Sequence, residues 1–211
     1  MRRRVTPLSV RLYEAADEVF WAARLNLLWT VFTLAGGVLL GVGPATVAAY
    51  TVARRHACGE AFPVWSTFAA VWRREFGRGS LVVLPLAGAA ALLVTNYAYF
   101  ASLGSTATAL RLTTLAALTV LALIATYLLP MLVHYDMPGR AYLPRALHFA
   151  LTRPAPSVLL LFLGTAIAYA STLYPFLVLV VAVGGWIQLD TWLCLRLFAE
   201  NEARLQAERT S

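Results

Sequence analysis

The chain has 211 residues, of which 60% are hydrophobic and only 13% are charged. Soluble domains carry roughly a quarter of charged residues, so this composition excludes a soluble globular protein and predicts one membrane domain over residues 1–211. All 17 basic residues are arginine, and the net charge is +7. The arginines lie at the ends of apolar runs and form no single basic face. This pattern favours contact with anionic lipids over nucleic-acid binding.

Six apolar segments recur along the chain, and most of them reach the ~20 residues that cross a hydrocarbon core of ~30 Å. They cover residues 20–41, 43–57, 80–103, 110–134, 156–174 and 176–197. Short connections join them in pairs, so we expect three helical hairpins at about 20–57, 80–134 and 156–197. The predicted fold class is an all-α integral membrane protein with about six transmembrane helices.

The second segment is short, because only ten residues separate Pro44 from Arg54, and it either crosses the membrane or re-enters without crossing. If all six segments cross with the N-terminus inside, 16 of the 17 arginines are cytoplasmic and Arg111 is outside. A re-entrant segment lowers the best split to 11 against 6. The positive-inside rule therefore favours crossing. We expect a multi-pass protein of a bacterial plasma membrane with both termini cytoplasmic.

The turn between the first two segments is rich in small residues. Gly36, Gly37, Gly41 and Gly43 are predicted to let the two helices approach closely. Pro44 suits the first turn of the returning helix, where its missing N–H has no partner to lose. An alternative interpretation is a broken helix that contacts a substrate, as in some transporters.

The two longer connections are predicted to form amphipathic helices in the cytoplasmic interface, at about 62–77 and 142–152. Aromatic residues recur at spacings of three and four in the first of them: Phe62, Trp65, Phe68, Trp72 and Phe76. The second shows the pattern more weakly, with Tyr142, Ala146 and Phe149 on one face. Each helix precedes a hairpin, which fits either three copies of one unit or an ordinary series of hairpins.

Several motifs carry a resemblance to a known family. They include Asn26-Leu27-Leu28-Trp29, Gly43-Pro44-Ala45-Thr46, and the stretches PVWSTF, WRREF, LLPMLVHYD and FALTRP. Over nearly the whole chain the sequence resembles the YesL-like family of bacterial integral membrane proteins (domain of unknown function 624). Members of that family are often encoded beside carbohydrate ABC importers and glycoside hydrolases. The resemblance therefore implies the multi-span topology and an association with carbohydrate uptake.

Ionisable and polar groups inside predicted spans are candidate functional or structural sites. They are Arg24, Asn26, His134, Asp136, Gln188 and Asp190, with Pro44 in the turn. We expect an interhelical ion pair between Asp190 and Arg24, with Asn26 satisfying a second lone pair of the carboxylate. The alternatives are a proton or substrate relay that uses Asp190 and His134, and solvation of these groups in the membrane interface.

Catalysis is not expected. His134, Tyr135 and Asp136 are adjacent, so their side chains point in different directions on a helix, and no serine or cysteine nucleophile accompanies them. No HExxH, CxxC or phosphate-binding glycine loop is present. The sequence therefore predicts neither an enzyme, nor a metal site, nor a bound cofactor.

Three functions remain open. The preferred one is an accessory or regulatory component of carbohydrate (ABC-type) uptake, with membrane lipids and an importer permease or another membrane protein as partners. The two aromatic–arginine helices would offer the surface for that permease. The alternatives are a small secondary transporter that uses the Pro44 hairpin and Asp190, and a membrane-organising scaffold without substrate.

Overall fold

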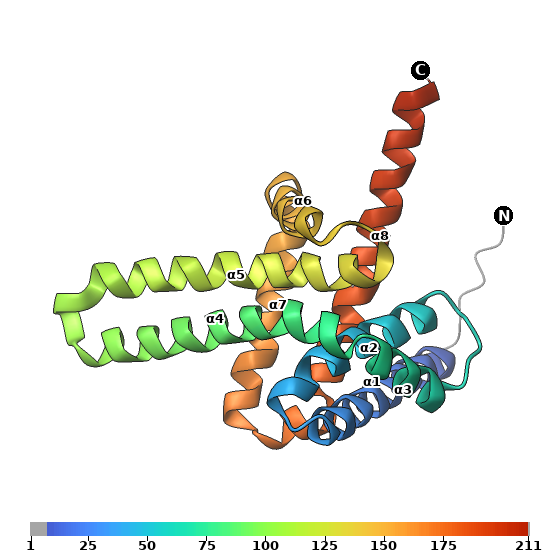
Figure 1. The fold of residues 1–211 in the computed structure, drawn as a ribbon, viewed down its shortest axis with the longest axis horizontal. Coiled ribbons are helices and arrows are strands. Elements are labelled where there is room, and N and C mark those ends of the chain that lie inside the picture. The colour runs from blue at the N-terminus through green and yellow to red at the C-terminus, as the bar shows by residue number, and fades with distance from the viewer. Residues whose placement is uncertain (1–7, 211) are drawn as a thin grey trace.

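The computed structural model describes residues 8–210, which form helices and no strand (Figure 1). Residues 1–7 and 211, which include Arg2, Arg3 and Arg4 of the arginine count, lie outside the described residues. The helices are α1 (Leu8–Ala35), α2 (Leu39–Ala57), α3 (Val64–Arg74), α4 (Phe76–Ser102), the 3₁₀ turn η1 (Gly104–Ala107), α5 (Thr108–His134), α6 (Gly139–Thr152), α7 (Pro154–Leu173), the π-helical turn η2 (Val178–Ala182) and α8 (Val183–Thr210).

Four stretches within residues 8–210 are long and apolar enough to cross a membrane. They are Phe76–Ser102, Gly104–His134, Pro154–Leu173 and Val178–Ala203. The first two predicted spans are not among them, so the count of six spans is not confirmed. α1 begins well before the predicted span and includes Glu14, Asp17 and Glu18, which lower its apolar character.

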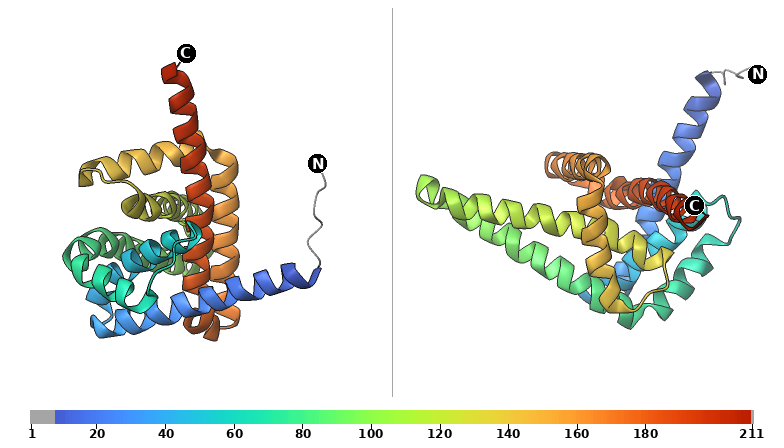
Figure 2. Two further views of the ribbon diagram at one scale, coloured as in Figure 1. Left: turned by 90° about the vertical axis from the view of Figure 1, so that its right-hand side faces the viewer. Right: turned by 90° about the horizontal axis from the view of Figure 1, so that it is seen from above.

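The long apolar helices do not share one axis. α4 and α5 run across the view of Figure 1, whereas α7 and α8 run up and down in it. Figure 2 confirms this from the side, where α7 and α8 remain upright and lie next to each other. If α7 and α8 lie along the normal of a flat bilayer, α4 and α5 lie across that normal, and the reverse holds if α4 and α5 lie along it.

α2 lies at the centre of the molecule and packs against α1, α4 and α8. Its crossing with α4 is close, because a Cβ at Gly43 would lie 2.6 Å from the Cα of Ser80. Pro44 is buried inside α2, five residues after the helix begins, so its placement in the first helical turn was wrong. Proline donates no backbone hydrogen bond to the residue four positions earlier. The Ser80 hydroxyl lies 3.1 Å from the Leu40 carbonyl and 2.7 Å from the Phe76 carbonyl, so its single proton is shared between the two acceptors.

The turn between α1 and α2 confirms the close approach predicted from its glycines. A Cβ at Gly36 would overlap the backbone of Gly41, and a Cβ at Gly41 would overlap the Thr33 carbonyl. Val38 follows in a left-handed conformation with φ 60° and ψ −72°. The Leu39 N–H donates to the Gly37 carbonyl at 2.8 Å across it, which closes a strained γ-turn.

The two connecting helices turn their apolar faces toward the rest of the molecule. In α3, Phe68 is fully buried, and the rings of Trp65 and Trp72 lie 5.3 and 5.6 Å from that of Phe32 in α1. Trp65 nevertheless remains 58% exposed. In α6, Tyr142 and Ala146 are buried against neighbouring helices. Helices therefore form close to both predicted ranges, while their position in the membrane interface stays a prediction.

Candidate functional site

The fully buried carboxylate of Asp190 lies on α8 where that helix meets α2. The Tyr50 hydroxyl donates a hydrogen bond of 2.7 Å to one carboxylate oxygen. The Cys194 thiol lies 3.6 Å from the other oxygen and donates weakly. A carboxyl group in an apolar interior requires such partners or protonation. The partner of Asp190 is therefore a neutral phenol.

The predicted ion pair between Asp190 and Arg24 was wrong. The Arg24 side chain is exposed, and its guanidinium lies 5.9 Å from the centroid of the Trp21 ring. α1 contacts α8 at Ala22 and Asn26. The contact is close, since a Cβ at Gly184 would overlap the backbone carbonyl of Ala22 and the backbone nitrogen of Asn26. Arg24 lies two residues from each of them. A helix turns by ~100° per residue, so Arg24 points away from α8.

Asn26 is fully buried, but it does not assist the carboxylate as expected. Its amide nitrogen donates to the carbonyls of Val178 and Leu179 at 3.1 and 2.7 Å. Its amide oxygen accepts from the N–H groups of Val183 and Gly184 at 3.0 and 2.9 Å. A π-helical turn interrupts the regular backbone ladder. One side chain from α1 therefore satisfies backbone groups at the start of η2 and just after its end.

His134 lies at the end of α5, away from Asp190. Its Nε2 is 3.7 Å from a Glu202 carboxylate oxygen, and its ring is 5.1 Å from that of Phe198. Phe198 is eight residues beyond Asp190, or ~12 Å along a helix. The structure therefore does not bring His134 and Asp190 together as the proposed relay requires.

Two neighbours of His134 have separate environments. Asp136 is exposed, in the connection that follows α5. The Tyr135 hydroxyl donates to Glu202 at 3.1 Å. Burial, together with that hydrogen bond and the negative charge of Glu202, raises the pKa of the Tyr135 phenol to about 12. Tyr135 is therefore a neutral donor at ordinary pH.

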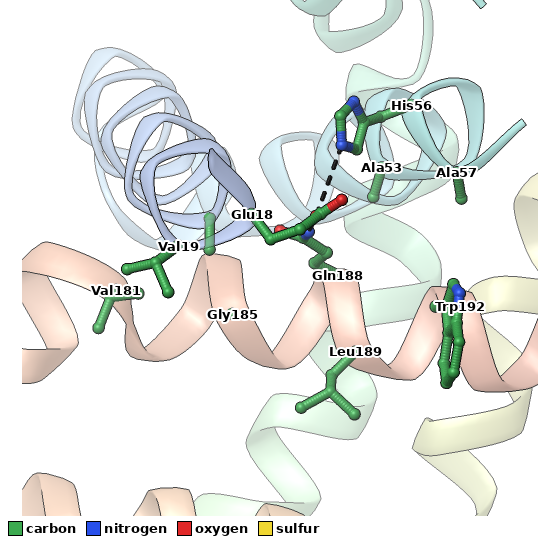
Figure 3. Close-up of a pocket in the computed structure, with 11 residues that line it drawn as sticks. Glu18, Val19, Ala53, His56, Ala57, Val181, Gly185, Gln188, Leu189 and Trp192 are labelled. Carbon is green, nitrogen blue, oxygen red and sulfur yellow. Dashed lines mark hydrogen bonds and ion pairs between the residues drawn. The ribbon is translucent and has the colours of Figure 1, made fainter. Parts of the chain in front are cut away.

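A groove of about 620 Å³ opens between α1, α2 and α8 (Figure 3). The residues that define it are Glu18, Val19, Ala22, Ala53, His56, Ala57, Val181, Gly185, Gln188, Leu189 and Trp192. The Glu18 carboxylate lies 3.6 Å from His56 Nε2 and also accepts a hydrogen bond from the Gln188 amide. The groove thus combines a polar cluster with apolar walls, as small-molecule sites do.

The groove depends on the packing beneath it. The His56 ring stacks on Trp21 of α1 with centroids 4.0 Å apart, which fixes the end of α2 against α1. Val181 lies in η2, so the π-helical turn that Asn26 stabilises forms part of the wall. Gln188 is the sole predicted polar candidate among the residues that line the groove.

Sequence reasoning missed Glu18, His56, Tyr50 and Trp192. Glu18 lies just before the first predicted span and His56 lies at the end of the second, so neither was among the polar candidates inside a span. A signal existed for Tyr50, because a phenol among Ala48, Ala49 and Ala53 needs a hydrogen-bond partner when the small residues bring another helix close. No local pattern identifies Trp192, which joins the groove only through the packing of α8.

Comparisons of the sequence with known proteins place the chain in a family. The family model described as "Protein of unknown function, DUF624" matches residues 22–97. The chain is 36% identical to "Uncharacterized protein YesV" of Bacillus subtilis (strain 168) over 151 residues, which cover 71% of this chain and 73% of that protein. The chain belongs to the DUF624 family. The resemblance drawn from the Asn26 and Pro44 motifs is therefore confirmed.

Two further Bacillus subtilis (strain 168) proteins are similar to this DUF624 chain. "Uncharacterized protein YesL" is 31% identical over 139 residues, covering 65% of this chain and 66% of YesL. "Uncharacterized protein YteU" is 29% identical over 174 residues, covering 79% and 77% of the two chains. No solved structure matches. The segment matched by the DUF624 model includes Asn26, Tyr50 and His56 but ends before α8, so the groove extends beyond it.

Proposed function

We propose that this DUF624 protein is a non-catalytic, ligand-responsive accessory or regulatory component of carbohydrate (ABC-type) uptake in the bacterial plasma membrane. The observation that carries the proposal is the course of α8. This helix lines the groove from Gly185 to Trp192 and then continues beyond the other helices as a projecting end (Figure 1). A change of packing at the groove would therefore move a surface that a partner can contact.

The surface available to a partner differs from the one expected from sequence. The aromatic faces of α3 and α6 pack largely against the protein itself, so they are not free for docking. Arg73 and Arg74 of α3 remain exposed, as do Glu200 and Glu202 of α8. We propose that an importer permease contacts these charged positions, while membrane lipids cover the apolar helices.

Affinity purification with identification of bound proteins tests the accessory role. We expect the full chain, extracted from its native membrane, to enrich a permease or ATPase subunit of an importer. The double change Arg73→Gln with Arg74→Gln should abolish that enrichment and leave the fold intact, because both side chains belong to the proposed contact surface and are exposed. Arg111→Gln, at the far end of the α4–α5 hairpin, is the matched control. Absence of any importer subunit from the full-chain sample would refute this role.

We also propose that α1 and α2 cross the membrane, giving six spans with both termini cytoplasmic. In this topology the α4–α5 hairpin must turn relative to α7 and α8 from the crosswise arrangement of Figure 1. The distribution of arginines supports this topology. Reporter fusions test it: fusions near Glu60 and after Ser211 should report cytoplasm, and a fusion near Ser105 should report the outside. An outside signal at Glu60 would make α2 re-entrant.

A second candidate function is secondary transport. Two observations favour it: Asp190 has a buried carboxylate with no ion pair among the described residues, and η2 interrupts the helix that lines the groove. Interrupted helices and intramembrane carboxylates are features of transporters. Proteoliposomes should then accumulate solute, and Asp190→Asn should stop uptake without lowering thermal stability. A protein that shows neither flux nor an importer partner would be a membrane-organising scaffold.

A further inference from the structure

The polar wall of the groove offers hydrogen-bond acceptors to a ligand. The side-chain N–H of Gln188 donates a hydrogen bond to the Glu18 carboxylate. The side-chain oxygen of Gln188 is buried and has no protein partner among the described residues. The Glu18 carboxylate remains half-exposed beside His56. A buried acceptor without a partner is costly, so rotation of the Gln188 amide into the groove is favoured when a bound molecule brings an O–H or N–H donor to this oxygen.

The far end of the groove is closed by an aromatic ring. Figure 3 shows Trp192 at that end, beyond Leu189. The Arg196 guanidinium lies 3.6 Å from the centroid of the Trp192 ring. Arg196 is one helical turn further along α8, and helical side chains lean toward the N-terminus, so it covers the ring face that points away from the groove. The opposite face is left for a ligand.

The charges around the groove disfavour an ionic ligand. A cation at Trp192 would face Arg196 across the same ring, and the carboxylate of Glu18 already has His56 beside it. An anion would meet the Glu18 carboxylate without an unpaired cation among the lining residues. The combination of acceptors, one aromatic face and a carboxylate already contacted by His56 fits a neutral molecule with several hydroxyl groups.

We infer that the groove binds a neutral, hydroxyl-rich small molecule of mono- or disaccharide size. Its ring would pack on Trp192 and its hydroxyls would donate to Gln188 and Glu18. A volume of about 620 Å³ is large enough for a ligand of this size. This inference deepens the proposed function by assigning a ligand class to the same groove.

The test is binding to the purified protein in lipid nanodiscs, which avoid detergents with sugar headgroups. Tryptophan fluorescence and thermal shift are followed with glucose, xylose, maltose and inositol as neutral probes, and with choline and phosphate as charged ones. We expect at least one neutral probe to bind with an affinity in the ordinary millimolar range or better, and the charged probes to bind at least about tenfold more weakly.

Two substitutions change the groove from α8. Gln188→Leu removes the unpaired acceptor, and Gly185→Leu fills the groove, since a Cβ there meets nothing closer than Val181 at 3.8 Å. Each should weaken binding by about tenfold or more. Gly88→Leu, in the exposed part of α4, and Trp65→Leu, in α3, are the matched controls and should leave affinity unchanged.

Three results would overturn the inference. They are failure of every neutral probe to bind at roughly 100 mM, tighter binding of choline or phosphate, and equal binding by Gly185→Leu and the unmodified chain. The measurement contains no partner protein. Loss of the accessory role would therefore leave a positive binding result intact, and a negative result would leave the purification experiment unaffected.

Discussion

The α4–α5 hairpin and the junction of α1, α2 and α8 are both built from apolar helices, but they are packed in different ways. In α4 the buried residues are Gly79, Ser80 and Val83, all near its start, and the rest of the helix is largely exposed. In α2 every residue from Gly43 to Tyr50 is buried. The hairpin meets its surroundings mainly through side chains that suit lipid, whereas the junction depends on small residues and paired polar groups.

This difference predicts where substitutions should lower the stability of the protein. In a membrane the hairpin gains stability from contact with lipid that any apolar side chain provides, so individual residues there are interchangeable. At the junction Asn26 and Asp190 have specific hydrogen-bond partners, and a Cβ at Gly184 would overlap the backbone of α1. The same substitution made in the two regions should therefore have very different effects.

The largest expected effect comes from Asn26→Leu. The change leaves the carbonyls of Val178 and Leu179 and the N–H groups of Val183 and Gly184 without their partner. Each buried unsatisfied group costs about 1–3 kcal/mol, and partial relaxation of η2 should leave a net loss of about 4 kcal/mol. Chemical denaturation in nanodiscs measures it. Asn96→Leu in the hairpin is the control, and a similar loss in both variants would contradict the comparison.

Next in size is Gly184→Ala. The added methyl group would overlap the backbone of Ala22 and Asn26, so α1 and α8 must separate, at a cost of about 3 kcal/mol. Gly185→Ala has open space around its Cβ, and so does Gly88→Ala in the hairpin. Both should be neutral or gain up to about 1 kcal/mol from the higher helix propensity of alanine. Thermal melting of the three variants measures these differences. Equal melting temperatures would show that α1 and α8 are not closely packed at Gly184.

A smaller effect is expected at the buried carboxylate. Tyr50→Phe removes the donor to Asp190 and should cost about 1–2 kcal/mol. Asp190→Asn keeps an acceptor for the Tyr50 hydroxyl and removes a group that is costly to bury as an anion, so its stability should equal or exceed that of the unmodified chain. Thermal unfolding in detergent measures both. Tyr99→Phe, at an exposed position of the hairpin, should have no effect.

Those measurements also distinguish the phenol partner from an ion pair. An ion pair with Arg24 would make Asp190→Asn strongly destabilising and Arg24→Gln equally so. We expect Arg24→Gln to change stability by less than about 0.5 kcal/mol, because its side chain is exposed.

An effect of about 1 kcal/mol is expected at the turns that join the helices. The hairpin places Gly104 at φ +70°, where glycine is unstrained, whereas the α1–α2 turn places Val38 at φ 60°. Val38→Gly should therefore gain about 1 kcal/mol, and Gly104→Val should lose a similar amount. Differential scanning fluorimetry of the two variants checks the signs. A loss for Val38→Gly would mean that its side-chain contacts outweigh the backbone strain.

Sequence reasoning succeeded where the signal is local. Long apolar runs gave the helices α4, α5, α7 and α8, because length and hydropathy are properties of a segment by itself. Glycine spacing predicted the close α1–α2 turn, since only a missing Cβ permits such contact. The motifs around Asn26 and Pro44 indicated the family, which the similarity to YesV confirmed.

What the sequence by itself determined is a helical membrane protein of the DUF624 family, with Asp190 and Asn26 as polar residues in need of partners. Which partners they take was decided by the tertiary structure alone, because a partner on another helix depends on the rotation and depth of both helices. Arg24 lies two helical positions from the residues of α1 that contact α8, so its side chain points outward. Asn26 forms its hydrogen bonds with the π-helical turn, and Tyr50 binds Asp190, which is 140 residues away in the sequence. The groove arose in the same way, because Glu18, His56 and Gln188 become neighbours only when α1, α2 and α8 have packed.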